Sequence, residues 1–250
     1  MSIEMKSDSI SRAGETAAST EAIPGYEALR EKFQEGEIWN RKHLMAEEKL
    51  IAILSCLVME QRLFSFSEKV NVALDQGVAP RALSEVVLQA GLYGGMPLVE
   101  TMSEILGKIF QERNLQPDPE LLPEQDSESL MESALEYRQA LHGERSQTNH
   151  ADPSNQQTLE LYSLTTSFGY GLVWRRPGLS VRKRFIVAMA CFAAMGCVEN
   201  FFKKFALSAI EHNFNAQDIR EVLIQISPYI GFPRALQALA LVKPDIEGES

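Results

Sequence analysis

The amino-acid sequence predicts an all-α protein, and three observations support this fold class. Apolar side chains recur at intervals of three and four residues, as at Ile219, Val222 and Ile226, which is the spacing of one helix face. No window alternates apolar and polar residues with the period of two that is typical of a strand. Two stretches of about 70 residues also resemble each other, so one helical unit is expected twice.

The second of these stretches shows where its first helices begin and end. Ser180 is placed to cap the apolar run Val181–Met195, because a serine hydroxyl accepts a hydrogen bond from the first turn. A helix over Glu199–His212 is expected to end at Asn213, since Asn tolerates the left-handed backbone that closes many helices. Gly77 occupies the same place in the first stretch.

The following two helices also have recognisable starts. Asn215, with Asp218 three residues later, indicates the beginning of a helix over Ala216–Ser227. A Tyr-x-Gly-x-Pro turn then leads into a helix over Arg234–Val242. The prolines at helix starts in the two stretches are Pro80, Pro97 and Pro233.

The similarity of the two stretches predicts a tandem duplication. The pairs at an offset of 135 are Gly36 and Gly171, Trp39 and Trp174, Arg41 and Arg176, Leu44 and Leu179, Ile51 and Ile186, and Cys56 and Cys191. The pairs at an offset of 136 are Ala73 and Ala209, Glu85 and Glu221, Val86 and Val222, Gln89 and Gln225, Tyr93 and Tyr229, Gly95 and Gly231, and Pro97 and Pro233. Thirteen ordered matches with one gap are not expected by chance.

Charge is distributed unevenly along the chain. Its 34 acidic and 24 basic residues give a net charge of −10, which argues against a nucleic-acid partner. Segment 112–155 has 10 acidic and 3 basic residues and four prolines, which is typical of a linker, whereas 156–243 has 10 basic and 5 acidic residues. The predicted divisions are a disordered segment 1–23, a first repeat 24–111, an acidic linker 112–155, a second repeat 156–243 and an acidic tail 244–250.

Cysteine usage and the absence of long apolar segments predict a cytoplasmic protein. The three cysteines, Cys56, Cys191 and Cys197, are too few for a disulfide framework. The N-terminal residues lack the apolar core of a secretory signal. The longest apolar run, Phe185–Val198, has 14 residues and is shorter than a membrane span, so we expect a helix buried on most sides and no membrane contact.

Three motifs carry a resemblance to a known family. They are Gly171-Leu-Val-Trp-Arg-Arg-Pro-Gly-Leu179, the basic start Arg182-Lys-Arg184 of an apolar helix, and Ile219-Arg-Glu-Val-Leu-Ile-Gln-Ile-Ser-Pro-Tyr-Ile-Gly-Phe-Pro233. Together they resemble the carboxymuconolactone decarboxylase family, within the alkylhydroperoxidase-D-like superfamily. The resemblance implies two tandem helical bundles, joined here by the acidic linker. It also implies self-association, and a tandem chain is expected to form a trimer that imitates the hexamer of single-copy members.

The catalytic residues of that family are missing from their expected places. The histidine position is Phe205 in the second repeat and Lys69 in the first, and the glutamate of the same pattern is replaced by Phe201 and Ser65. The Cys-x-x-Cys pair of the hydroperoxidase branch falls on Val198 and Phe201, so an alkylhydroperoxidase-like antioxidant is the less favoured alternative. His142 and His150 lie in the predicted linker, and no metal site and no cofactor are expected.

Several residues remain candidates for chemistry, each with a structural alternative. Lys69, Glu199 and Tyr229 are the candidate catalytic residues. For Lys69 a solvated lysine on a helix face is the preferred alternative, and for Tyr229 the alternative is a structural hydroxyl bonded to backbone. Arginine suits the two oxygens of a carboxylate, but Arg176 and Arg41 could instead pack on the neighbouring indoles. The candidate substrate-binding residues are Arg176, Trp174, Phe201, Phe205, Arg41 and Trp39. The basic start Arg182-Lys-Arg184 is expected to be a solvated face.

These residues favour an enzyme without redox chemistry. The hypothesis is a lyase or isomerase that decarboxylates, isomerises or cyclises an unsaturated cyclic carboxylate or lactone. Phenylalanines at the former catalytic positions favour a large apolar substrate, such as a polyketide- or terpene-like intermediate of secondary metabolism. The alternative is a catalytically degenerate oligomeric scaffold or small-molecule carrier. A dry core between the helices would indicate the scaffold, and a pocket of several hundred Å³ the enzyme.

Overall fold

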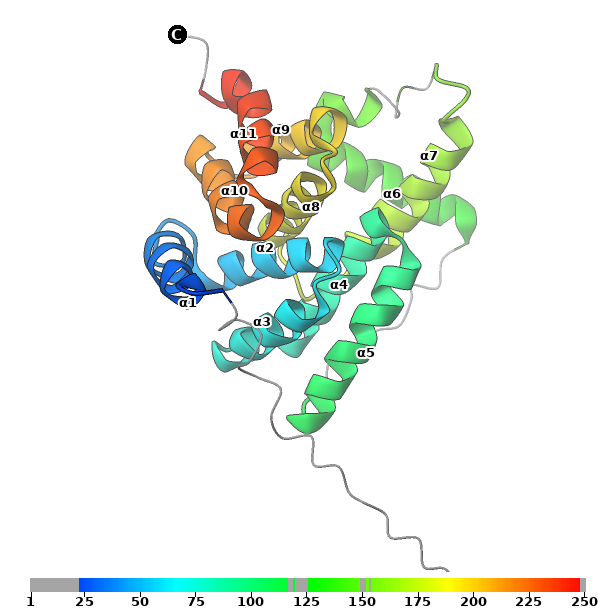
Figure 1. Ribbon diagram of the computed structural model, residues 1–250. Helices are drawn as coiled ribbons and strands as arrows, with labels where there is room; N and C mark the ends of the chain where they lie inside the picture. Colours follow the sequence, from blue (N-terminus) through cyan, green and yellow to red (C-terminus); the bar gives the residue numbers. More distant parts are fainter. Residues whose placement is uncertain (1–22, 117–118, 120–125, 149–151, 153, 248–250) are drawn as a thin grey trace, which may run out of the picture. The chain divides into compact units, whose positions relative to one another are not determined.

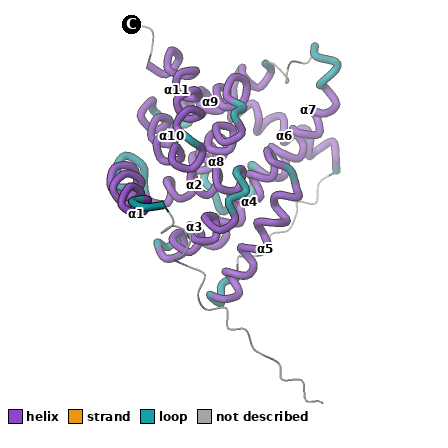
Figure 2. The backbone as a smooth tube through the Cα atoms, in the orientation of Figure 1, coloured by secondary structure: helices purple, strands orange, loops and turns teal. Residues whose placement is uncertain are grey.

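The computed structural model describes residues 23–116, 119, 126–148, 152 and 154–247. All regular secondary structure in these residues is helical, as Figure 2 shows, which confirms the predicted all-α class. Except for residue 23, the predicted disordered segment 1–23 lies outside the described residues, and so do His150 and the last part of the acidic tail, 248–250.

The chain divides into two compact units, residues 1–41 and residues 42–250. We call them the N-terminal unit and the main unit. In its described part, the N-terminal unit consists of helix α1, Tyr26–Leu29, which continues into the π-helical segment η1, Arg30–Trp39. Trp39 and Arg41 belong to this unit.

The main unit holds the other helices. The first stretch contributes α2 (Ala46–Met59), α3 (Leu63–Asp75), α4 (Pro80–Gly94) and α5 (Met96–Glu112). The middle of the chain contributes α6 (Ser127–His142), the 3-10 turn η2 (Gly143–Gln147), α7 (Leu159–Thr165) and the π-helical η4 (Thr166–Val173). The second stretch contributes α8 (Val181–Met195), the π-helical η5 (Val198–Phe202), α9 (Lys203–Glu211), α10 (Ala216–Ile230) and α11 (Phe232–Glu247).

Helices from the first and the second stretch form one core in the main unit. Helices α2 and α8 pack against each other, and α4 and α10 each contact both of them (Figure 1). The side chains of α8 are buried from Arg184 to Ala194, in agreement with the expected helix buried on most sides. The two stretches therefore share a core, and the tandem duplication stays a prediction.

The helix ends follow the local signals in the sequence. The Ser180 hydroxyl accepts a hydrogen bond from the Lys183 backbone N–H and caps α8, as predicted. Asn213 has a φ of 65° and Gly77 a φ of 82°, so both adopt the expected left-handed conformation. Asn215 caps α10 through the backbone N–H of Asp218 at 3.0 Å. Local hydrogen bonding is thus sufficient to define these boundaries.

Segment 112–155, expected as a linker, contains an ordered helix. Asp126 caps α6 by accepting hydrogen bonds from the backbone N–H groups of Glu128 and Ser129. The helix packs closely on η4 at Gly171. A Cβ atom added to this glycine would lie only 2.9 Å from Cδ1 of Leu130 on α6. Its last buried residue is His142. The helix therefore supplies side chains to the interior of the main unit.

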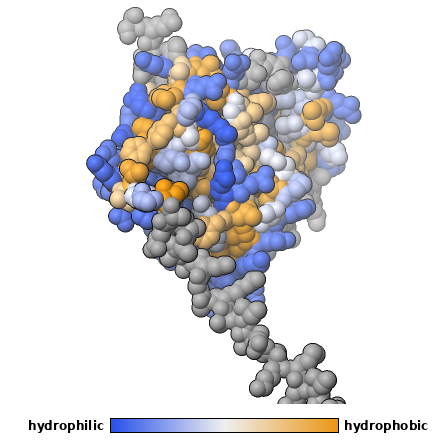
Figure 3. All heavy atoms as spheres, in the orientation of Figure 1, coloured by the Kyte–Doolittle hydropathy of each residue, from blue (hydrophilic) through white to orange (hydrophobic). Residues whose placement is uncertain are grey.

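Figure 3 shows hydrophobic side chains in separate patches on the drawn face, with hydrophilic residues between them. Among the described residues, each helix is too short or too polar to traverse a bilayer.

Candidate active site

The main unit contains a cavity of about 520 Å³ between helices that are distant in sequence. Its lining residues are Leu92, Tyr93, Thr148, Thr158, Leu161, Tyr162, Thr165, Gly169, Tyr170, Trp174, Phe192, Met195, Cys197, Phe201, Lys204 and Phe205. Helices α4, α7, η4, α8, η5 and α9 therefore all contribute to the wall. A mostly apolar cavity of several hundred Å³ with a few polar groups is the usual form of a small-molecule site.

Much of the cavity wall is aromatic. The ring centroid of Phe205 lies 5.7 Å from that of Trp174 and 5.1 Å from that of Phe192. Phe201, four residues before Phe205, stacks on Phe192 at 5.3 Å and is 39% exposed, so it stands at the rim. Residues four apart in a helix share one face, which explains why both phenylalanines reach the same cavity.

Lys204 is the one charged residue in the described lining of the cavity. Burial, followed by the positive charges of Arg138 and Arg145, lowers the pKa of Lys204 from 10.5 to about 8. No carboxylate of the described residues lies within ion-pair distance of its ammonium group. Because water and counter-charge are both scarce around this ammonium, it would interact strongly with negative charge that enters the cavity.

A buried hydrogen-bonded chain leads from the cavity into the protein. The hydroxyl of Tyr170, which lines the cavity, lies 2.9 Å from Nε2 of His142, and Nδ1 of His142 lies 2.8 Å from Oγ of Ser208. His142 is fully buried, and burial together with nearby cations, Lys204 first among them, lowers its pKa from 6.5 to about 2. The imidazole is therefore neutral near pH 7, with both nitrogens engaged.

His142 corrects an expectation from the sequence. Its ring centroid lies 4.8 Å from that of Phe205, the residue at the expected histidine position. An imidazole therefore does lie beside this position, although it comes from α6 and was assigned to a linker. The apolar spacing of Leu130, Ala134 and Leu141 after the capping residue Asp126 is the signal that could have predicted this helix.

The hydroxyl of Tyr93 connects the cavity to a buried polar cluster. It accepts hydrogen bonds from Gln89 and Trp174, while burial raises the pKa of Tyr93. The Gln89 side chain donates to the backbone oxygen of Arg184 at 2.8 Å, and Arg184 pairs with Glu85 at 3.0 Å. Arg184, expected on a solvated face, is 1% exposed, because the carboxylate on α4 compensates its charge inside the protein.

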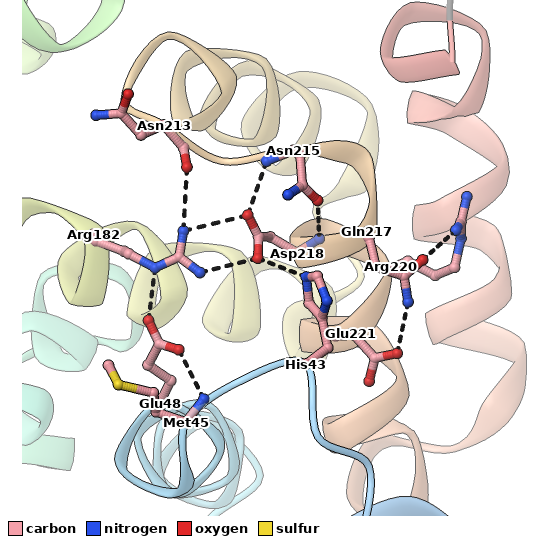
Figure 4. A network of polar contacts seen from close by, with 10 residues as sticks. All are labelled: His43, Met45, Glu48, Arg182, Asn213, Asn215, Gln217, Asp218, Arg220 and Glu221. Carbon is pink, nitrogen blue, oxygen red and sulfur yellow. Dashed lines mark hydrogen bonds and ion pairs between the residues drawn. The ribbon is translucent and has the colours of Figure 1, made fainter.

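A second polar network joins three helix starts outside the cavity. Figure 4 shows Arg182 between Glu48 and Asp218, with nitrogen–oxygen distances of 2.6 Å and 3.0 Å. His43 contacts Asp218 at 2.9 Å, and Asn215 completes the cap of α10. None of these residues lines the described cavity, and their bonds satisfy helix ends, so the network is structural.

The candidate substrate-binding residues separate into three groups. Trp174, Phe201 and Phe205 line the cavity together. Arg176 lies elsewhere in the main unit, where its Nε donates a hydrogen bond to Glu85 on α4 at 3.0 Å. Trp39 and Arg41 belong to the N-terminal unit, whereas the residues that line the cavity belong to the main unit.

The three candidate catalytic residues do not lie in the cavity wall. Lys69 is half-buried on α3, and Tyr229 is half-buried on α10. Glu199 is exposed in η5 and borders a different, smaller hollow of about 270 Å³. The residues that the sequence did not single out, and that the fold brings to the cavity, are Tyr170, Lys204 and, behind the wall, His142.

The cysteines show no arrangement for peroxide reduction. All three are described and all are free thiols, with Cys56 and Cys191 buried as expected. Burial raises the pKa of both buried thiols, which is the opposite of what a reactive thiolate needs. Within the described residues, His, Cys, Asp and Glu form no group of three that could hold a metal ion.

The fold and the cavity define a class of protein: a helical protein with an aromatic-walled cavity. Residues 160–244 match the model of the carboxymuconolactone decarboxylase family, so this part of the chain is similar to that family. The matched range includes the cavity residues from η4, α8, η5 and α9.

A relative with an assigned activity supports the same family. The chain is 23% identical over 118 residues to the 4-carboxymuconolactone decarboxylase of Acinetobacter baylyi (strain ATCC 33305 / BD413 / ADP1). This similarity covers 47% of the present chain and 87% of the relative. At family level, these similarities fit a lyase-like enzyme.

Proposed function

We propose that this protein is a non-redox lyase or isomerase whose substrate, an unsaturated cyclic carboxylate or lactone, binds in the 520 Å³ cavity. One observation carries the proposal: the aromatic wall contains a single described charge, the ammonium of Lys204. Decarboxylation or double-bond migration in such a ring develops dienolate-like negative charge. An ammonium group in a site that excludes water stabilises that charge far more than the same group in water.

Tyr170 is the candidate hydrogen-bond donor in this proposal. Burial raises its pKa well above 10, so the phenol keeps its proton and suits hydrogen bonding to a developing oxyanion. We assign the His142 proton to Nε2, so that His142 donates to the Tyr170 oxygen and leaves the phenol O–H free for the cavity. Ser208 then donates to Nδ1 while accepting a weak bond from Nε of Arg145 at 3.5 Å.

The lining favours a substrate larger and more apolar than a simple lactone diacid. Phe201 and Phe205 stand where the family pattern has a glutamate and a histidine, so two polar catalytic groups are replaced by rings. A polyketide- or terpene-like ring system would bury its carbon skeleton against these phenylalanines and place its carboxylate or lactone oxygen at Lys204.

A ligand and turnover screen tests the proposal. Purified protein is incubated with aromatic and unsaturated carboxylates and lactones, and both thermal stabilisation and product mass are measured. Replacing Lys204 by Met keeps the chain length but removes the charge, and is expected to reduce turnover at least tenfold. Lys203→Met is the matched control, because Lys203 pairs with Asp245 at 2.9 Å and does not line the cavity. An unchanged rate in Lys204→Met contradicts the proposed role.

The alternative function, a small-molecule carrier, is favoured by the complete burial of His142, since a carrier needs no accessible acid or base. Saturable binding without any conversion would support the carrier over the lyase, and no binding at all would support a scaffold. Self-association belongs to the same proposal: light scattering should give a mass about three times the 28.0 kDa of the chain. A monomer would contradict the expected trimer.

A further inference from the structure

We propose that Lys204 forms a reversible imine with apolar aldehydes or ketones that enter the cavity. The inference uses the same cavity as the proposed lyase function but does not require that reaction. It assigns to this chain a covalent carbonyl-binding site, and the expected ligand is an aromatic or similarly apolar carbonyl compound.

The position of Lys204 distinguishes it from neighbouring lysines. It lies in the first turn of α9, directly before Phe205, and lines a wall that also contains Trp174. Lys203 binds Asp245 at 2.9 Å and Lys183 binds Glu47 at 2.5 Å, so both of those ammonium groups are held by carboxylates. Lys204 has no such partner among the described residues, so ion pairing does not hold its amine in the charged form.

The electrostatic surroundings favour the neutral, nucleophilic amine. Burial and the two nearby guanidinium groups of Arg138 and Arg145 both disfavour a further positive charge. With a pKa of about 8, half of Lys204 is neutral at pH 8. An ordinary lysine with a pKa of about 10.4 is less than about 1% neutral at that pH. Desolvation beside another cation is an established way to activate a lysine for imine formation.

The reaction balances without any further reagent. The lone pair of the neutral Nζ attacks the carbonyl carbon and forms a C–N bond, while the carbonyl oxygen gains a proton. The resulting carbinolamine loses its hydroxyl group as water. Overall, the carbonyl oxygen leaves with the two protons of the amine and a C=N bond remains. Tyr170 lines the same cavity, and in this proposal its hydroxyl is the donor to the carbonyl oxygen during the attack.

The cavity wall selects the carbonyl partner. Trp174, Phe192 and Phe205 form a continuous aromatic surface with ring centroids 5.1 to 5.7 Å apart at Phe205. An aromatic aldehyde would bury its ring there, whereas a polyhydroxylated aldehyde would leave hydroxyl groups without partners. The cavity therefore favours apolar over polar carbonyl compounds of the same reactivity.

Reductive trapping tests this inference on the whole chain. The protein is incubated at pH 8 with 4-isopropylbenzaldehyde and sodium cyanoborohydride, which reduces an imine to a stable amine, and the modified lysines are identified by peptide mass mapping. We expect Lys204 to be modified at least tenfold faster than Lys203, with a rate that rises with pH to a midpoint near 8. Glyceraldehyde in place of the aromatic aldehyde should not show this preference.

The experiment does not depend on a variant that folds, because Lys203 and Lys204 are compared in the same unaltered molecule. Lys204→Arg, which keeps the charge but cannot form an imine, should abolish the fast phase, and Lys203→Arg should not. Equal modification of Lys203 and Lys204 would overturn the inference. Trapping without conversion of any lactone or carboxylate would count against the proposed lyase function alone, and conversion without trapping would count against this inference alone.

Discussion

Replacing Glu85 by Gln is expected to destabilise the main unit strongly. Glu85 is 1% exposed, and its Oε1 accepts hydrogen bonds from Nε of Arg81 and Nε of Arg176, both at 3.0 Å. Its Oε2 accepts from a terminal nitrogen of Arg184 at 3.0 Å. One buried carboxylate thus compensates three guanidinium groups, and it joins α4 to the start of α8.

The size of this loss of stability depends on how deeply the three arginine partners of Glu85 are buried. Breaking a buried ion pair from one side costs about 3–5 kcal/mol, because the remaining charge is left without compensation. The side chain of Arg184 is 1% exposed, whereas those of Arg81 and Arg176 are 14% and 19% exposed and keep some contact with water. We therefore expect the lower end of the range, about 3 kcal/mol, which corresponds to a decrease in Tm of about 6–12 °C for a chain of this size.

Urea unfolding followed by circular dichroism measures this loss. The control is Asp75→Asn, because Asp75 binds Arg113 at 2.7 Å but is 65% exposed, and breaking such a surface pair costs less than about 1 kcal/mol. The double variant Glu85→Gln with Arg184→Met should lose less stability than the two single variants added together. A loss below about 1 kcal/mol in Glu85→Gln would refute the reasoning that one carboxylate supports this cluster.

Three further predictions concern stability. His142 has a pKa of about 2 in the folded protein and an ordinary value of 6.5 when unfolded, so only the unfolded state gains this proton as the pH falls below 6.5. The free energy of unfolding should therefore fall by about 1.4 kcal/mol per pH unit below pH 6 because of His142. In urea unfolding measured at several pH values, His142→Gln should lack this pH dependence. Gly77→Ala should lower the free energy of unfolding by about 1 kcal/mol, because Gly77 has a left-handed φ of 82°. Gly107→Ala, at an exposed position inside α5, should raise it by about the same amount. Equal changes in Tm for the two variants would contradict this prediction. Ser180→Ala removes the cap of α8 and should cost about 1 kcal/mol by chemical denaturation, and an unchanged midpoint would show that the cap is dispensable.

Helix boundaries were the most predictable part of this fold. The predicted range Val181–Met195 coincides with α8, and Asn213 and Asn215 take the backbone roles expected of them. Helix α10 runs three residues beyond its predicted end at Ser227, through Pro228 to Ile230. Proline disturbs a helix chiefly through the backbone of the preceding turn, so a short extension near a helix end is tolerated.

Long-range pairing accounts for the contacts that the sequence did not predict. Arg184 follows two other basic residues and was expected in solvent, yet it is compensated by Glu85, 99 residues earlier. His142 stands in an acidic, proline-containing segment, and its partners Tyr170 and Ser208 come from elements 28 and 66 residues later. A charge count over a local segment contains no information about either contact.

The candidate site was only partly accessible from sequence. The replacement of a catalytic pattern by phenylalanines drew attention to Phe201 and Phe205, and both line the cavity with Trp174. Lys204 was passed over in favour of Lys69, because position in the family pattern was the guide. Burial, which separates a lysine with a pKa of about 8 from a solvated one, depends on which helices pack around it.

Helix type, helix ends and the family resemblance are written in short stretches of this chain, because capping, left-handed turns and apolar spacing act between residues a few positions apart. The cavity and the environment of its polar side chains are not determined by such short stretches. Lys204, Tyr170 and His142 acquire their surroundings when α6, η4 and α9 pack together, and only that packing buries the lysine and the imidazole and brings Tyr170 to His142. Desolvation and long-range hydrogen bonds are properties of the assembled core, which is why the tertiary structure was needed to find the site.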